Sequence, residues 1–359
     1  MKEIFKNLCV DGKIMDITAQ NGIISKIGTV SDTGIDFHGM KAYPGLIDIH
    51  THGIGGMDTM DADFAIMAKL QAKNGTTTFY PTTMTASHEA IVRVLTAPFP
   101  DIGARIAGFH LEGPYINEKY KGAQNAAYVR KPDFEEFKAF ENVKLITIAP
   151  ETKGAEEFIK NTDAVICLGH TDADYETAMS AARAGAKCLT HTFNAMPPLH
   201  HRKPSLIGAA FDSDMYVQVI CDGKHIHPSV IRILYKIFGA DRMVLISDSM
   251  RATGLADGDY EFGGLEITVK DKTARAQDGV LAGSTSTLFE CVRCAIEFGI
   301  PEGDAFKMAS ETPARLMGLN RGIIETGRDC DLIILNDKNE LDTVIIGGRI
   351  LQGEMSIRI

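Results

Sequence analysis

The 359-residue sequence lacks an apolar run long enough to span a membrane, and residues 1–6 lack the apolar segment of a signal peptide. Positive charge is also in deficit, because 37 Lys and Arg stand against 47 Asp and Glu, a formal net charge of −10 at pH 7. This deficit argues against nucleic acid as a partner, although a local basic patch could still hold a small anion. We therefore expect a cytoplasmic protein that binds neither membranes nor nucleic acid.

The cysteines do not form a disulfide pattern. There are seven, an odd number, and they stand in apolar surroundings, which predicts reduced core residues. Cys291 and Cys294 form a lone C-x-x-C, and without a second pair or a nearby histidine the interior of a helix is favoured over a zinc or redox site. With 45% hydrophobic and 23% charged residues, the chain fits a soluble enzyme of one large domain, with or without a small companion.

Between residues 46 and 320, strand-like runs alternate with helical patterns, which is typical of a parallel barrel or a doubly wound sheet. The strand-like runs are 46–50, 76–80, 105–112, 144–148, 164–168, 186–190, 216–220 and 243–247. The helical patterns are 64–73, 87–95, 133–140, 175–184, 229–238 and 287–298, several of them followed by glycine. Residues 260–269 predict an inserted hairpin, and 313–319 predict the last helix.

Both ends of the chain show short β patterns instead. Asx-Gly turns at Asp11-Gly12 and Asn21-Gly22 separate strand runs near the N-terminus. Near the C-terminus, 331–335, 343–348 and 349–353 read as strands without helical periodicity. Two small sheets at opposite ends of a chain most simply pack together.

Polar residues follow the predicted strands of the middle part. Glu112 ends an apolar run just before Gly113-Pro114, which can continue neither a helix nor a paired strand. His50 and His52 lie two residues apart, so their roots point to one face of a strand, ~6.6 Å apart. The fifth to eighth strands end near His170, His191, Asp222 with His225, and Asp248, in that order.

Each of these residues alone is more often a rim or core residue with satisfied hydrogen bonds. Their convergence on one barrel face favours an active site, because parallel barrels carry their chemistry where the strands end. Imidazole and carboxylate together suit zinc or iron(II), with a position left open for water.

At this point the sequence resembles a known family, the N-acetylglucosamine-6-phosphate deacetylases of the amidohydrolase superfamily. The resemblance runs nearly end to end and is carried by residues 44–52, 110–114, 168–171, 190–196 and 247–248. It implies an α/β fold, a (β/α)8 TIM-type barrel of residues 46–320 with a small β-sandwich built from residues 1–45 and 321–359. It also implies hydrolysis of N-acetyl-D-glucosamine 6-phosphate to D-glucosamine 6-phosphate and acetate, a step of amino-sugar catabolism.

The resemblance also assigns roles to residues. Glu112, His170 and His191 would hold the principal divalent metal, Zn or Fe(II), and Asp248 would be the general base and acid. Because His50 and His52 are both intact, a second and weaker metal site is expected, giving one or two ions per subunit. The substrate would be bound by Ala123, Gln124, Asn194, Ala195, Arg202, Asp222, His225, Leu281, Ala282 and Gly283.

Two of these positions call for comment. Many relatives have a histidine where this chain has Gln124, and glutamine can donate and accept hydrogen bonds but cannot be charged. Arg202 stands in a basic stretch, 200–203, and is the expected contact for the 6-phosphate, while His200 and Lys203 are left open. The family further implies a homodimer in which a loop reaches the neighbouring site.

Two alternatives remain at this stage. A cyclic-amide hydrolase of the dihydroorotase kind would share the terminal sandwich and the His-x-His pair, but it needs a carboxylated lysine at the end of the fourth strand. Here that strand ends at 148–151 as Ile-Ala-Pro-Glu, and Lys144 stands at its start. A binding or scaffold protein that has lost the site is the second alternative, and the intact ligand positions argue against it.

Overall fold

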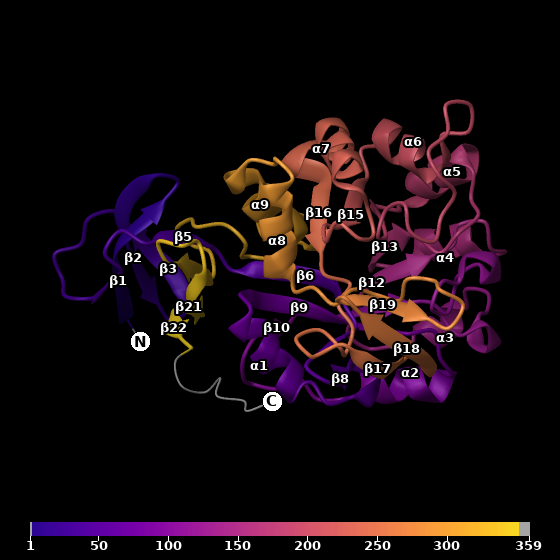
Figure 1. The fold of residues 1–359 in the computed structure, drawn as a ribbon, viewed down its shortest axis with the longest axis horizontal. Helices are drawn as coiled ribbons and strands as arrows, with labels where there is room; N and C mark the ends of the chain where they lie inside the picture. The colour runs from indigo at the N-terminus through magenta and orange to yellow at the C-terminus, as the bar shows by residue number, and fades with distance from the viewer. Residues whose placement is uncertain (1, 352–359) are drawn as a thin grey trace.

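The computed structural model describes residues 2–351 and contains a nearly closed barrel of parallel strands (Figure 1). In chain order the barrel strands are β6 (Leu46–Thr51), β9 (Thr76–Thr83), β10 (Arg105–Ile106) with β11 (Phe109–Glu112), β12 (Val143–Ile148), β13 (Val165–Leu168), β14 (Cys188–Leu189), β15 (Tyr216–Ile220) and β16 (Met243–Ile246). β10 and β11 act as one interrupted strand, because they pair in succession with the two halves of β9.

The barrel closes between its first and last strands through backbone hydrogen bonds at the mouth. The Asp248 amide donates to the His50 carbonyl over 2.9 Å, and the His52 amide donates to the Ser249 carbonyl over 2.8 Å. Every residue of β6, β9 and β16 is buried, as expected for parallel strands covered on both faces. The closure therefore brings the end of β6 directly beside the end of β16.

Helices surround the barrel. They are α1 (Ala65–Lys73), α2 (His88–Leu95), α3 (Phe134–Phe137), α4 (Ala155–Asn161), α5 (Tyr175–Ala184), α6 (Ser205–Asp212), α7 (Pro228–Arg242), α8 (Leu288–Glu297), α9 (Glu302–Met308) and α10 (Glu311–Met317). Local sequence explains several boundaries. Thr287 and Glu290 form a reciprocal capping box that starts α8, and Gly239, with φ of +65°, interrupts α7 where the predicted helix 229–238 ends.

The sequence pattern missed α4, α6 and α9. All three are short, and α6 and α9 contain Gly208 and Gly303, which weaken a helical signal. Burial of their apolar residues against the barrel stabilises them instead. The C-x-x-C pair lies within α8 and its cysteines are free, as predicted.

Strands from both ends of the chain form one mixed sheet beside the barrel (Figure 1). Its members are β1 (Lys2–Val10), β2 (Lys13–Gln20), β3 (Ile23–Ile27), β4 (Ile35–Asp36), β5 (Lys41–Pro44), β20 (Leu332–Leu335), β21 (Leu341–Ile346) and β22 (Arg349–Ile350). The two ends meet where β20 pairs antiparallel with β5, and the sheet has its own apolar cluster around Phe5, Ile17 and Leu332.

The barrel with an added sheet from both termini confirms the predicted fold class. The division of the chain near residues 45 and 321 into two domains stays a prediction, and residues 352–353 of the last predicted strand lie outside the described residues. After β16, an antiparallel sheet of β17 (Gly258–Phe262), β18 (Leu265–Lys270) and β19 (Thr273–Ala276) contains the predicted hairpin and one more strand. Within residues 2–351, none of the helices has the length and apolar character needed to cross a bilayer.

Candidate metal centre and active site

The predicted metal ligands and Asp248 lie together at the mouth of the barrel, where the strands end. His50 belongs to β6, His52 follows it, and Glu112 is the last residue of β11. The other three residues each follow a strand by two positions and have positive φ, with His170 at +48°, His191 at +24° and Asp248 at +47°. Such backbone conformations are uncommon for residues other than glycine and are frequent at functional sites.

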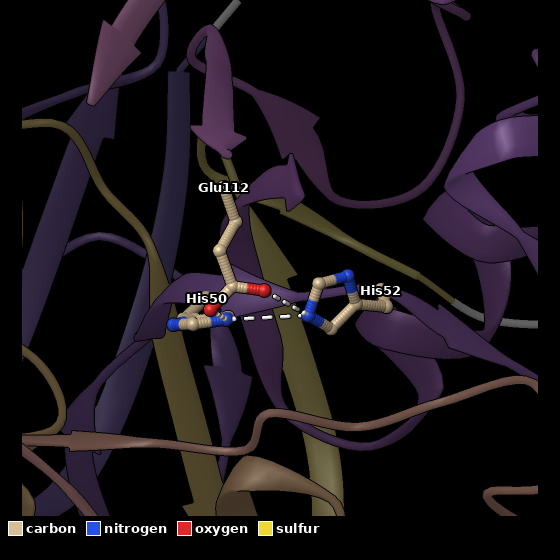
Figure 2. A group of neighbouring side chains, drawn as sticks. All are labelled: His50, His52 and Glu112. Carbon is tan, nitrogen blue, oxygen red and sulfur yellow. Dashed lines mark hydrogen bonds and ion pairs between the residues drawn. The ribbon is translucent and has the colours of Figure 1, made fainter. Parts of the chain in front are cut away.

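Figure 2 shows the first group of ligands, His50, His52 and Glu112, which are all buried. The Nε2 atoms of the two histidines are 3.3 Å apart. His50 Nε2 lies 3.3 Å from Glu112 Oε1, and His52 Nε2 lies 3.2 Å from Glu112 Oε2. Three potential ligand atoms therefore face one small volume.

A second group shares the same glutamate. His170 Nε2 and His191 Nε2 lie 3.2 and 3.0 Å from Glu112 Oε1, and they are 3.0 Å from each other. Glu112 thus belongs to both groups, an arrangement suited to two metal ions with one bridging carboxylate. The predicted ligand set is brought together in full.

The proton positions of the histidines fit a cation. The Nδ1 atoms of His52 and His170 donate to the backbone carbonyls of Thr82 and Tyr120 over 3.1 and 2.8 Å, and His50 Nδ1 donates to the side-chain oxygen of Gln218 over 3.1 Å. In a neutral imidazole the other nitrogen, Nε2, then carries only a lone pair. These lone pairs face carboxylate oxygens and one another, so a positive charge is needed between them. The donor set fits a divalent metal.

A proton can supply that charge when no metal is bound. Burial alone would lower the pKa of His52, but hydrogen bonds and charge from Asp248 and Glu112 raise it to about 10. Burial would raise the pKa of the Glu112 carboxyl, yet the neighbouring His50 and His170 rings hold it well below its usual range. Metal binding would therefore displace protons from this cluster.

Asp248 stands beside the first group of ligands. Its Oδ1 lies 3.4 Å from His50 Nε2 and 3.3 Å from His52 Nε2, and its side chain is 10% exposed. Burial would raise the pKa of this carboxyl, but the charges of His50 and His52 lower it. Asp248 is therefore an ionised carboxylate that reaches both the metal ligands and the solvent side of the site.

A cavity of about 440 Å³ opens over the centre and is lined by His52, Glu112, His170, His191 and Asp248. Most of the predicted substrate residues also line it, namely Ala123, Gln124, Asn194, Ala195, His225, Leu281 and Gly283. Ala282, between two lining residues, is fully buried in an apolar cluster. The cavity is also lined by residues that the sequence pattern did not single out. They include Lys119, which follows Glu112-Gly113-Pro114 in the sequence, and Phe262 of β17.

Besides Ala282, two predicted substrate residues, Asp222 and Arg202, lie outside the cavity lining. Asp222 instead holds His225, because its Oδ2 lies 2.8 Å from His225 Nδ1 and its Oδ1 accepts from the His225 amide over 3.0 Å. Arg202 is exposed on the loop before α6, where its Nη1 lies 2.6 Å from His201 Nε2. Within one subunit, Arg202 is therefore not brought to the metal centre.

Gln124 contacts a metal ligand directly. Its Nε2 donates to Glu112 Oε2 over 2.7 Å, and its Oε1 accepts from the Thr85 amide over 2.6 Å. The side chain is buried and is held at both ends. Gln124 therefore orients Glu112 as well as lining the cavity.

The fourth-strand lysine of a cyclic-amide hydrolase has no counterpart at the mouth. Lys144 is exposed near the start of β12. Thr147 and Ile148 form the other end of this strand, which is the end at the barrel mouth. Glu151, which follows this strand, accepts hydrogen bonds from Asn117 and from the Asp172 amide. The site thus differs from that alternative in both residue and geometry.

Comparison with known proteins agrees with this geometry. The profile of the Amidohydrolase family matches residues 42–351. The N-acetylglucosamine-6-phosphate deacetylase of Bacillus subtilis is 39% identical over 330 residues, covering 86% of this chain and 83% of the relative. The N-acetylgalactosamine-6-phosphate deacetylase of Escherichia coli O157:H7 is 31% identical over 350 residues, covering 92% of this chain and 93% of that protein.

Among solved structures, a mutant N-acetyl-D-glucosamine-6-phosphate deacetylase from Mycobacterium smegmatis, in complex with N-acetyl-D-glucosamine-6-phosphate, superposes with a TM-score of 0.88. It is 30% identical, and the match covers 98% of both chains. The chain therefore belongs to the amidohydrolase family and, within it, to the N-acetylglucosamine-6-phosphate deacetylases.

Proposed function

We propose that this protein is a metal-dependent amide hydrolase that removes acetate from N-acetyl-D-glucosamine 6-phosphate to give D-glucosamine 6-phosphate. The observation that carries the proposal is the buried cluster of four imidazoles around Glu112, with Asp248 beside it, at the floor of an open cavity. Relatives that match nearly the whole chain are deacetylases of amino-sugar phosphates, which supports the same reaction.

The cofactor is one or two divalent ions per subunit, Zn or Fe(II). Glu112, His170 and His191 would hold the principal ion, while His50 and His52 would share Glu112 in holding the second. Nitrogen and carboxylate ligands suit these metals. When bound, the metal supplies Lewis acidity, which lowers the pKa of water and polarises the acetamide carbonyl.

Asp248 moves the proton in the reaction. Its carboxylate takes a proton from the attacking water as the oxygen bonds to the acetamide carbon, and the same carboxyl then gives that proton to the amine nitrogen as the C–N bond breaks. Acetate and the free amine are the products. Because Asp248 faces both His50 and His52, it is held at the metal ligands and cannot swing into solvent without losing these contacts.

The other cavity residues bind the sugar. Asp222 occupies Nδ1 of His225, which leaves His225 Nε2 for a contact with the substrate. Asn194 and the Ala195 amide are candidate neutral partners for the phosphate. Gln124 donates to Glu112, and both Gln124 and Ala123 line the cavity.

We further propose that the protein acts as a homodimer in which Arg202 binds the phosphate in the neighbouring subunit's cavity. Within its own subunit Arg202 is exposed; its Nη1 lies 2.6 Å from His201 Nε2, and its amide donates to His200 Nδ1 over 3.3 Å. Two large apolar side chains are exposed on this side of the chain: Leu199, which adjoins the loop, at 45%, and Phe211, at the other end of α6, at 52%. Burial of this surface against a second copy would explain why these residues face outward.

Acetate release from a panel of sugars tests the proposal. N-acetylglucosamine and N-acetylgalactosamine, each with and without the 6-phosphate, are incubated with purified protein loaded with Zn²⁺ or with Fe²⁺. We expect the fastest release from N-acetylglucosamine 6-phosphate. Faster release from N-acetylgalactosamine 6-phosphate would reassign the substrate, and no release from any phosphorylated sugar would overturn the proposal.

A further inference from the structure

In each histidine of the metal centre, one ring nitrogen faces away from the centre and can donate a hydrogen bond. His52 and His170 use backbone carbonyls, those of Thr82 and Tyr120. His191 Nδ1 has no hydrogen-bond partner within residues 2–351. His50 differs from all of these, because its Nδ1 faces a side chain, that of Gln218.

Gln218 is an unusual residue for its place. It is fully buried in β15, between the apolar residues Val217 and Val219, on the strand next to β16. A buried amide costs free energy unless its polar atoms are hydrogen-bonded. Its backbone is satisfied by the strand and by the Thr192 amide, so the side chain must find partners inside the barrel.

The side-chain oxygen of Gln218 reaches ligand residues of both groups. It accepts from His50 Nδ1 over 3.1 Å and from the His191 amide over 3.4 Å. The nitrogen, Nε2, points the other way, 3.5 Å from Cys167 Sγ. Because the His191 amide can only donate, the atom that faces it must be the oxygen, which fixes the orientation of the amide.

That orientation determines the state of His50. With an acceptor at Nδ1, the ring carries its proton there and presents the lone pair of Nε2 to Glu112 and Asp248. Figure 2 shows the His50 ring beside the Glu112 carboxylate. The opposite tautomer would place a proton where a metal must bind. Groups that hydrogen-bond to a metal-bound histidine in this way set its tautomer and raise its basicity.

We propose that Gln218 is a positioning residue of the metal centre, which holds His50 in the tautomer and orientation needed to bind the second ion. This inference rests on the metal-dependent function proposed above. Gln218 itself touches neither the metal ligand atoms facing the centre nor the substrate cavity. It acts through His50, and in part through the backbone of His191.

The test measures zinc binding to metal-free protein by competition with a chelating indicator, together with circular dichroism to check folding. Gln218→Met removes the acceptor while keeping the length and buried volume of the side chain. We expect the most weakly held ion to bind ten- to hundredfold more weakly, the usual effect of losing such a partner. The more tightly held ion, bound by Glu112, His170 and His191, should change by about threefold or less.

A matched control separates this role from a general loss of packing. Gln71, in α1, is also a buried glutamine, and its Nε2 donates to Thr51 Oγ1 at the end of β6 over 3.1 Å. Within residues 2–351 its side chain makes no hydrogen bond to a metal ligand side chain. Gln71→Met should leave both zinc affinities unchanged. If Gln71→Met weakened the same ion as much as Gln218→Met does, the effect would come from packing and the proposal would be overturned.

Gln218→Glu provides a second readout that does not depend on the Met variant folding. Its carboxylate still accepts from His50 Nδ1, so the weakly held ion should bind as tightly as in the wild type or more tightly. Tenfold weaker binding in this variant, or unchanged binding in Gln218→Met, would overturn the proposal. Wild-type protein that binds no zinc would instead refute the proposed metal-dependent function.

Discussion

Replacing Asp248 by asparagine removes the proposed proton carrier while preserving its shape. Asp248 has φ of +47°, a conformation that asparagine tolerates better than alanine does, so the backbone at the end of β16 should not change. The asparagine oxygen can still lie 3.3 to 3.4 Å from His52 and His50, but the amide can take no proton from water.

The expected loss follows from the role. General acid–base catalysis raises the reaction rate by a factor of about 10²–10⁴. At 1.36 kcal/mol for each tenfold, this is about 3 to 5 kcal/mol of activation free energy. Because Asp248 is not a member of either ligand group, bound metal and the thermal midpoint should stay near the wild-type values.

The assay measures kcat and KM for acetate release, and metal content by elemental analysis, on the same preparation. We expect kcat to fall by at least a hundredfold with KM and metal content little changed. A rate within about threefold of the wild type would refute the assignment of Asp248 as the acid–base group. A parallel loss of metal and activity would instead make Asp248 a ligand.

Four further predictions follow from the site. Glu112→Gln should reduce bound metal to trace amounts by elemental analysis, whereas His50→Ala should remove at most the second ion, because Glu112 belongs to both groups. Arg202→Ala should raise KM for the phosphorylated sugar about ten- to hundredfold, matching a charge-assisted hydrogen bond of about 1.5–3 kcal/mol, and leave unphosphorylated N-acetylglucosamine unaffected. Gln124→His should change kcat or its pH profile, because it replaces the amide that donates to Glu112; no change in either would exclude a role for Gln124 in the reaction. Removal of metal with a chelator should lower the melting temperature, since metal at about 100 times its Kd contributes about 2.7 kcal/mol, and an unchanged temperature would count against a bound metal.

Much of the fold could be predicted because the barrel strands are short, continuous apolar runs. Runs such as 144–148 and 216–220 stand out by length and by the glycine-marked helices between them, and they match β12 and β15 closely. The helices α6 and α9 could not be found this way, because internal glycines hide a helix that packing stabilises. The third strand of the insertion, β19, was missed because it has only four residues.

The metal ligands were predictable because histidines and acids at strand ends form a pattern along the chain. The residues that hydrogen-bond to these ligands form no such pattern. The acceptors for His52 and His170 are backbone carbonyls, which every residue has, and Gln218 is a single glutamine inside a strand. Arg202 shows another limit, because its position in the sequence suggests a phosphate contact but the folded subunit leaves it exposed.

The most direct test of the central claim is a metal titration of metal-free protein, with bound metal and acetate release from N-acetylglucosamine 6-phosphate measured in the same samples. The account predicts no acetate release without metal, and release that rises with the first equivalent of Zn²⁺ or Fe²⁺. Bound metal should saturate at no more than two ions per subunit, and the Glu112→Gln variant should release no acetate at any metal concentration. Full acetate release by protein that contains only trace metal would contradict it.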